Sequence, residues 1–189
     1  MTKKKKIIII CIAVLAVTAA GLAAGFYAYI NRYDAGDYVQ AVLDVSYKGK
    51  TGAYVEMTGV SEEEAKAVFE DNLDATMEGF DASDMPEELR PQYRELFGEL
   101  AESVNYTVGE PERQEGGGYT VNVKVKPVTL FSDTYDTFQQ KAQEYADQIT
   151  DSVMQGGEMP TEEEMQKQVY QIYYDVLREA LDKGSLYGE

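Results

Sequence analysis

Apolar residues recur every three or four positions along much of this chain, which predicts a mainly helical protein. The first such segment covers about residues 37–47, and Gly49 is placed to end a helix there. The second covers residues 61–80 and begins with Ser61 and Glu64, whose spacing matches a capping box. Both segments are therefore predicted as amphipathic helices.

Three later segments show the same period. Residues 89–104 form one and residues 135–149 another, and Thr161 with Glu164 repeats the capping-box spacing at the start of the last. The link 155–160 is short and contains a Gly-Gly pair. We therefore expect the last two helices to lie antiparallel as a helical hairpin.

Between these helices the period changes from 3.6 to 2. In residues 119–125, Tyr and Val alternate strictly with polar residues, and three glycines, 116–118, precede them. This pattern predicts a β-hairpin with one buried face, in which Pro127 ends the second strand or marks an edge. Helices around such a hairpin predict an α+β domain, with helices packed on a small antiparallel β-sheet.

A different pattern precedes all of these elements, because the 24 residues Ile7–Ile30 contain no charge. A helix of that length would be about 36 Å long, enough to cross a hydrocarbon core of about 30 Å. Lys3–Lys6 lie before it and only Arg32 lies directly after it, which predicts a cytoplasmic N-terminus. We therefore predict a cytoplasmic basic flank (1–6), a transmembrane signal-anchor helix (7–30) and an extracytoplasmic domain (31–189).

A cleaved signal peptide is the alternative for this segment, because small residues would permit cleavage near Gly21 or Phe26. The apolar cores of signal peptides are usually about 7 to 15 residues long, so the length favours a retained anchor. Cys11 follows Ile9 and Ile10 instead of small residues, and we interpret it as an apolar side chain in the membrane and not as a lipidation site.

The composition of the remaining chain excludes several classes of function. Without Lys3–Lys6 it has 13 basic and 34 acidic residues, a net charge of 13 − 34 = −21, which argues against nucleic acid as a partner. The chain has no histidine, which removes the commonest general base and the usual zinc ligand. Its single cysteine lies in the apolar segment, so no disulfide is expected within the domain.

Three stretches carry a resemblance to known proteins: YVQAVLDVSYKGKTGAYVEMTGVSEEEAKAVFEDNLDA, ELRPQYRELFGELAESVNYTVGE and GYTVNVKVKPV. They resemble uncharacterised membrane-anchored or lipoprotein domains of Gram-positive bacteria that are described as similar to the NTF2-like fold. The resemblance spans most of residues 37–188. It implies a further strand pair and helix after Tyr187, where this sequence ends at Glu189, and it assigns no activity and no role to any residue.

Two sets of side chains are candidates for binding chemistry. An aromatic set on the last helix could bind sugar rings or peptides, although half-buried packing is the favoured interpretation: Tyr170, Tyr173 and Tyr174. An acidic set could bind calcium, but its spacing does not match an EF-hand loop, and a solvated acidic face is favoured: Asp71, Asp74, Asp81 and Asp84.

The leading hypothesis is a membrane-anchored interaction or binding module of the cell envelope, whose partner is another envelope protein or the cell wall. This hypothesis assigns no catalytic, cofactor-binding or metal-binding residues. The alternatives are an NTF2-like pocket that binds a small ligand and a metal-free enzyme that uses Tyr and Asp as acid and base. The interaction hypothesis predicts an apolar surface patch or an unpaired strand edge near residues 121–125.

Overall fold

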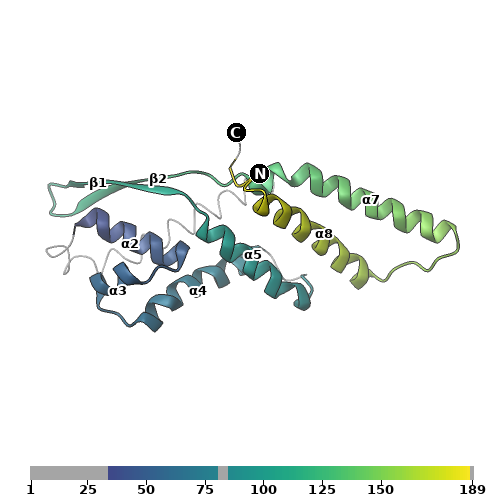
Figure 1. Ribbon diagram of the computed structural model, residues 1–189, viewed down its shortest axis with the longest axis horizontal. Coiled ribbons are helices and arrows are strands. Elements are labelled where there is room, and N and C mark those ends of the chain that lie inside the picture. The colour runs from purple at the N-terminus through teal and green to yellow at the C-terminus, as the bar shows by residue number, and fades with distance from the viewer. Residues whose placement is uncertain (1–33, 81–84, 188–189) are drawn as a thin grey trace. The chain divides into compact units, whose positions relative to one another are not determined.

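A computed structural model describes residues 34–80 and 85–187 of the chain (Figure 1). These residues form an α+β structure of helices and one two-stranded antiparallel sheet. The predicted membrane helix, 7–30, lies outside the described residues. Within them, no helix is both long enough and apolar enough to cross a membrane.

The helices and strands follow the order that the sequence pattern predicts. They are α2 (Ala35–Lys48), α3 (Gly52–Thr58), α4 (Glu62–Gly79), the 3₁₀ helix η2 (Glu87–Leu89), α5 (Arg90–Glu102), β1 (Tyr106–Arg113), β2 (Tyr119–Val125), α6 (Leu130–Asp133), α7 (Tyr135–Met154) and α8 (Glu162–Asp182). The three short helices α3, η2 and α6 were not predicted as separate helices.

The described residues group into two compact units. Unit 1 contains the described residues up to Phe69 together with Thr107–Lys124 of the β-hairpin. Unit 2 contains the described residues of Glu70–Tyr106 and those from Val125 onward. The helical hairpin formed by α7 and α8 belongs entirely to unit 2.

In unit 1, helix α2 lies against the β-hairpin through a close backbone approach. A Cβ atom added to Gly36 would lie 3.5 Å from the carbonyl oxygen of Gly109, and a Cβ atom on Gly109 would lie 3.0 Å from that of Asn122. A side chain at Gly109 would therefore crowd the backbone of β2, whereas a Cβ atom at Gly36 would make an ordinary contact with the Gly109 oxygen. The predicted C-terminal glycine of α2 is confirmed, because Gly49 adopts φ 60° there.

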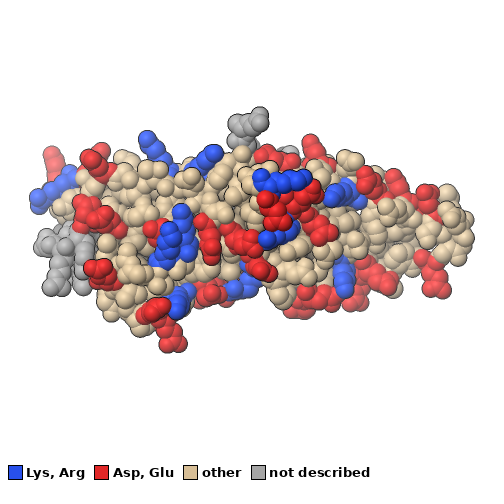
Figure 2. All heavy atoms as spheres, in the orientation of Figure 1, with Lys and Arg blue, Asp and Glu red and all other residues tan. Residues whose placement is uncertain are grey.

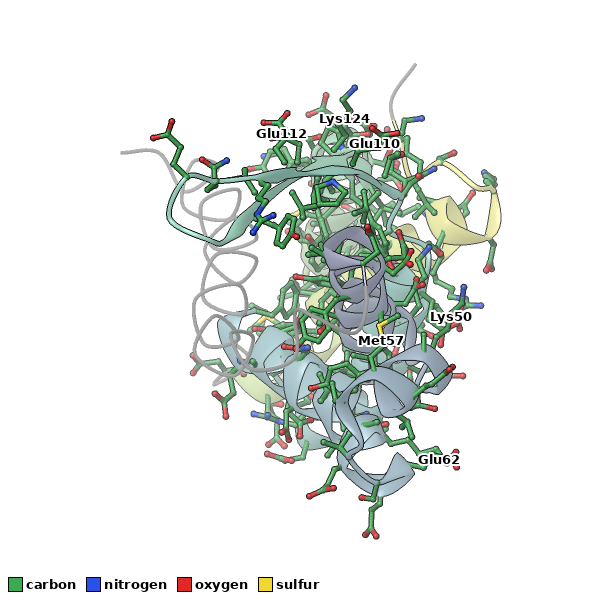
Figure 3. All side chains as sticks on the ribbon, turned by 90° about the vertical axis from the view of Figure 1, so that its left-hand side faces the viewer. Lys50, Met57, Glu62, Glu110, Glu112 and Lys124 are labelled. Atoms are coloured by element: carbon green, nitrogen blue, oxygen red, sulfur yellow. The ribbon has the colours of Figure 1, made fainter. Side chains whose placement is uncertain are left out.

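The face of the hairpin is less buried than predicted. Val121 and Val123 are half-buried, whereas Tyr119 and Val125 are exposed. A two-stranded ribbon is too narrow for both strands to be covered fully. On its other face, Glu110, Glu112 and Lys124 point away from α2 (Figure 3). The sheet consists of β1 and β2 alone among the described strands.

Helix α5 forms the centre of unit 2. The buried side chains of this helix are Tyr93, Leu96, Phe97 and Leu100. Other buried apolar side chains of unit 2 are those of Leu73, Met77, Met85, Leu89, Leu130, Val176 and Leu177. Leu130 is only 1% exposed, so α6, although four residues long, contributes directly to this core.

Both predicted capping boxes are present. Ser61 and Glu64 exchange hydrogen bonds at the start of α4, where the Ser61 backbone N–H donates to Glu64 Oε2 at 2.9 Å and the Glu64 N–H donates to Ser61 Oγ at 3.2 Å. Thr161 and Glu164 make the same pair at the start of α8, at 2.8 and 3.2 Å. Each box satisfies two backbone donors that a helix N-terminus otherwise leaves free.

Candidate interaction surface

The tyrosines on α8 belong to an aromatic cluster around Tyr93. The ring centroids of Tyr170 and Tyr174 lie 6.3 and 5.6 Å from that of Tyr93, in edge-on geometry. Tyr173 instead stacks on Phe80 at 6.1 Å. These rings pack on one another, and residues 170, 173 and 174 are each half-buried. The cluster therefore fits core packing better than an open aromatic face for sugars.

Tyr93 itself is fully buried, and its polar end is satisfied. Its side chain is 0% exposed, and its hydroxyl donates a hydrogen bond of 2.7 Å to the backbone oxygen of Tyr170. Burial raises the pKa of the Tyr93 phenol strongly, so the group stays protonated at physiological pH. Asp175, a carboxylate whose charge also raises this pKa, is exposed. This arrangement lacks the desolvated carboxylate that a Tyr/Asp acid–base pair would need.

Of the four acidic residues in the calcium hypothesis, the structure describes Asp71 and Asp74. Asp74 forms an ion pair with Arg94 at 2.9 Å, which Glu70 shares at 2.7 Å, and Asp71 is exposed on the same helix. Asp81 and Asp84 lie outside the described residues. Among the residues that are described, no group of Asp, Glu, Cys or His side chains could hold a metal ion.

The most unusual surface feature is the end of the α7–α8 hairpin, residues 153–160, which we call the hairpin tip. Two local motifs fix its backbone. At the end of α7, the Gly156 N–H bonds to the Val153 oxygen at 3.0 Å and the Gly157 N–H to the Ser152 oxygen at 2.9 Å, the pattern of a Schellman motif. Gly156 has the required left-handed φ of 89°.

The opposite side of the tip is held by the Thr161/Glu164 capping box described above. The space at Gly157 is also restricted, because a Cβ atom there would lie 2.9 Å from the Ser152 carbonyl oxygen. The loop between the two helices is therefore short and bonded at both ends. Side chains on it are displayed from a defined backbone, which reduces the entropy lost when a partner binds.

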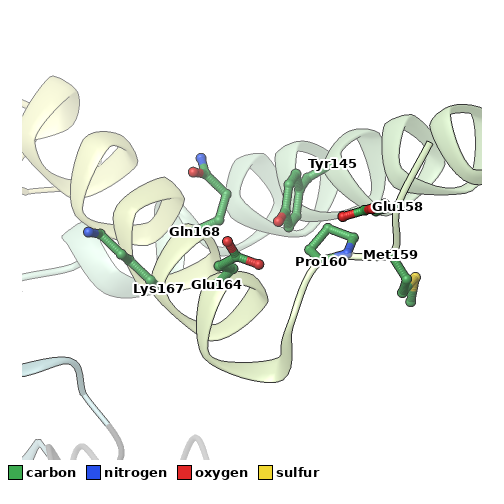
Figure 4. Close-up of a pocket in the computed structure, with 7 residues that line it drawn as sticks. All are labelled: Tyr145, Glu158, Met159, Pro160, Glu164, Lys167 and Gln168. Carbon is green, nitrogen blue, oxygen red and sulfur yellow. The ribbon is translucent and has the colours of Figure 1, made fainter.

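Three apolar side chains are exposed at this tip. Met154 is 76% exposed, Met159 is 62% exposed and Val153 is 38% exposed. In Figure 4, Met159 points away from the neighbouring side chains. Methionine is enriched at protein interfaces, and its flexible thioether adapts to varied partners. Exposed apolar side chains that lie together are typical of an interaction site.

Beside Met159 lies an open recess of about 510 Å³ between α7, the loop and α8 (Figure 4). Its lining side chains are those of Tyr145, Glu158, Met159, Pro160, Glu164, Lys167 and Gln168. One wall is the Tyr145 ring, and two carboxylates face the space. The single basic residue, Lys167, is already paired with Glu88 of η2.

The surroundings of the tip are strongly acidic. Residues 142–166 contain no Lys or Arg, and their acidic residues are Glu144, Asp147, Asp151, Glu158, Glu162, Glu163 and Glu164. On the face shown in Figure 2, carboxylates are spread along the α7–α8 hairpin, while its loop end is mostly uncharged. The tip therefore combines an apolar end with an acidic collar.

The sequence interpretation missed this surface. It treated residues 155–160 only as a link, although Met154 and Met159 flank the Gly-Gly pair where polar residues are usual. Val169 of α8 is also 37% exposed, although it lies about two helical turns before the buried Val176 on the same stripe. A helix that packs on few neighbours buries only a narrow stripe, and periodicity does not give its width.

Comparisons with known proteins add no further constraint. No family model, no curated protein and no solved structure matches this chain.

Proposed function

We propose that this protein is a membrane-anchored interaction module that binds another protein of the cell envelope. Residues 7–30 hold it in the membrane with the N-terminus in the cytoplasm, and the α+β domain lies outside. The uncharged segment behind four lysines supports this orientation. The partner is a protein and not a nucleic acid, because the domain is strongly acidic.

The observation that carries the proposal is the hairpin tip. Met154 and Met159 are displayed to solvent by a backbone that is fixed on both sides. Nothing in the packing of unit 2 requires apolar residues there, since neither contributes to its buried core. The described aromatic cluster, in contrast, is engaged in that core and offers no open binding face.

An NTF2-like fold is also only a proposal, and the interaction function does not depend on it. A closed ligand pocket of that kind needs a larger sheet than the two described strands provide. The enzyme alternative is less favoured for the same region, because the hydroxyl of Tyr93 is bonded to the backbone and the Asp175 carboxylate is exposed.

In vivo photo-crosslinking tests this proposal. The full chain is produced in cells with a photoreactive residue at one exposed position and is crosslinked in their membranes. The three positions are Gln92 of α5, Thr120 of β2 and Gln155 of the tip. The proposal predicts a protein adduct of defined mass from at least one position. Adducts from none of the three would contradict it.

A further inference from the structure

We infer that the hairpin tip binds a partner protein that presents an apolar recess bordered by lysine or arginine. This inference rests on the proposed function and names the chemistry of the partner. The partner that binds the tip is a different protein. It is neither a lipid bilayer nor a second copy of this chain.

The apolar half of the inference follows from the exposed side chains. Met154 and Met159 leave most of their surface in contact with water. Burying such side chains in a fitting recess is the main source of favourable free energy at interface centres. Because the tip is the turn between two helices, we expect the partner to receive its apolar side chains in a recess (Figure 1).

The basic half follows from the acidic collar. The tip cannot approach another surface without bringing Glu158 and the carboxylates at the start of α8 toward it. An acidic border on the partner would be repelled, whereas lysine or arginine would be attracted. The recess beside Met159 has room for such a side chain, between the Tyr145 ring and the carboxylates of Glu158 and Glu164. A cation over an aromatic ring and beside a carboxylate is favourable.

The acidic collar disfavours the two other possible partners, a lipid bilayer and a second copy of this chain. A bilayer that contains anionic lipids repels a segment with seven acidic and no basic residues, 142–166. A second copy would bring two equal acidic collars together, which costs free energy at any close approach. A protein surface with an apolar recess and a basic border is therefore the partner that suits both the apolar side chains and the charges of the tip.

Photo-crosslinking from Gln155 tests the inference, again with the full chain in its own membrane. The variant Met154→Ser/Met159→Ser removes the apolar end, and Glu158→Lys reverses a charge in the recess. We expect Met154→Ser/Met159→Ser to lower the yield of the protein adduct at least about tenfold, as the loss of interface-centre residues does. Glu158→Lys should also lower the yield, because the new lysine is repelled by the basic border of the partner. Higher salt should also lower the yield.

Matched controls keep the chemistry of each change but move it away from the tip. Val169→Ser removes an exposed apolar side chain from the same hairpin. Glu95→Lys makes the same charge reversal at an exposed position of α5. Neither should change the adduct. Thermal unfolding of every purified variant separates loss of binding from loss of folding.

The outcomes separate this inference from the proposed function. The crosslinked partner peptide should contain lysine or arginine close to apolar residues. A lipid adduct, an adduct with a second copy, or a protein adduct that Met154→Ser/Met159→Ser leaves unchanged would overturn the inference. A protein adduct from Gln92 or Thr120 with none from Gln155 would overturn it while the interaction function stands. Adducts from none of the three positions would remove both.

Discussion

Tyr93 provides the sharpest test of how unit 2 is held together. Its ring packs near those of Phe80, Phe97 and Tyr174. Its hydroxyl donates to the Tyr170 oxygen at 2.7 Å, 77 residues along the chain. The change Tyr93→Phe keeps the ring and removes only the hydroxyl. The net contribution of such a buried hydrogen bond is about 1 kcal/mol, so the free energy of unfolding should fall by that amount.

Removal of the whole ring should cost much more. Tyr93→Ala leaves a cavity at a position that is 0% exposed, for which about 3 to 5 kcal/mol is expected. Tyr119→Phe is the matched control, because Tyr119 is 37% exposed and should change the unfolding free energy by less than about 0.5 kcal/mol. Chemical denaturation of the full chain in detergent measures all three variants.

Two results would refute this reasoning. If Tyr93→Phe were no more destabilising than Tyr119→Phe, the hydrogen bond to α8 would contribute nothing to stability. If Tyr93→Ala cost less than about 1 kcal/mol, the ring would not lie in a well-packed core, since large-to-small changes in such cores cost several times more.

Three further predictions concern a helix end, a capping box and the orientation in the membrane. Gly49→Ala should lower the free energy of unfolding by about 1 to 2 kcal/mol, because φ is 60° at this position. Gly52→Ala is the control, because Gly52 lies in helical backbone with open space around it, and this change should be neutral or slightly stabilising. Thermal unfolding of both variants measures the difference. Hydrogen bonds from Thr161 hold the pKa of Glu164 below its ordinary value, so its carboxylate stabilises the fold above the ordinary pKa, and that contribution is lost as the pH falls through the lowered one. Wild type should thus unfold at a higher temperature than Glu164→Gln at pH 7 and converge with it in acid; a gap that persists in acid contradicts this. Glu112→Cys should react with a membrane-impermeant thiol reagent in intact cells, and reaction only after lysis would contradict the proposed orientation.

Local signals explain which parts of the fold could be predicted from the sequence. The Ser61/Glu64 and Thr161/Glu164 spacings are self-contained, because each box closes within four residues, and both are present as predicted. The alternation in residues 119–125 likewise identified the second strand. Such motifs depend on neighbours in sequence and need no knowledge of tertiary packing.

The features that prediction missed depend on distant residues. Helix α6 is too short to show a period, and Leu130 is buried only because α7 and α8 lie around it. Periodicity predicts a helix over residues 89–104 but does not identify the acceptor of the Tyr93 hydroxyl on α8. The exposure of Met154 and Met159 depends on which residues pack near the α7–α8 loop, and the sequence pattern does not contain that information.

The rate at which the tip methionines oxidise in native membranes tests most directly the claim that a partner binds the tip. Peroxide converts an accessible methionine to its sulfoxide, and mass spectrometry can compare Met154 and Met159 with Met57 of unit 1. The account predicts that, relative to Met57, the two tip residues oxidise more slowly in native membranes than in the purified full chain, because a partner covers them. Equal relative rates in the two preparations would show that the tip is uncovered in the cell and would contradict the account.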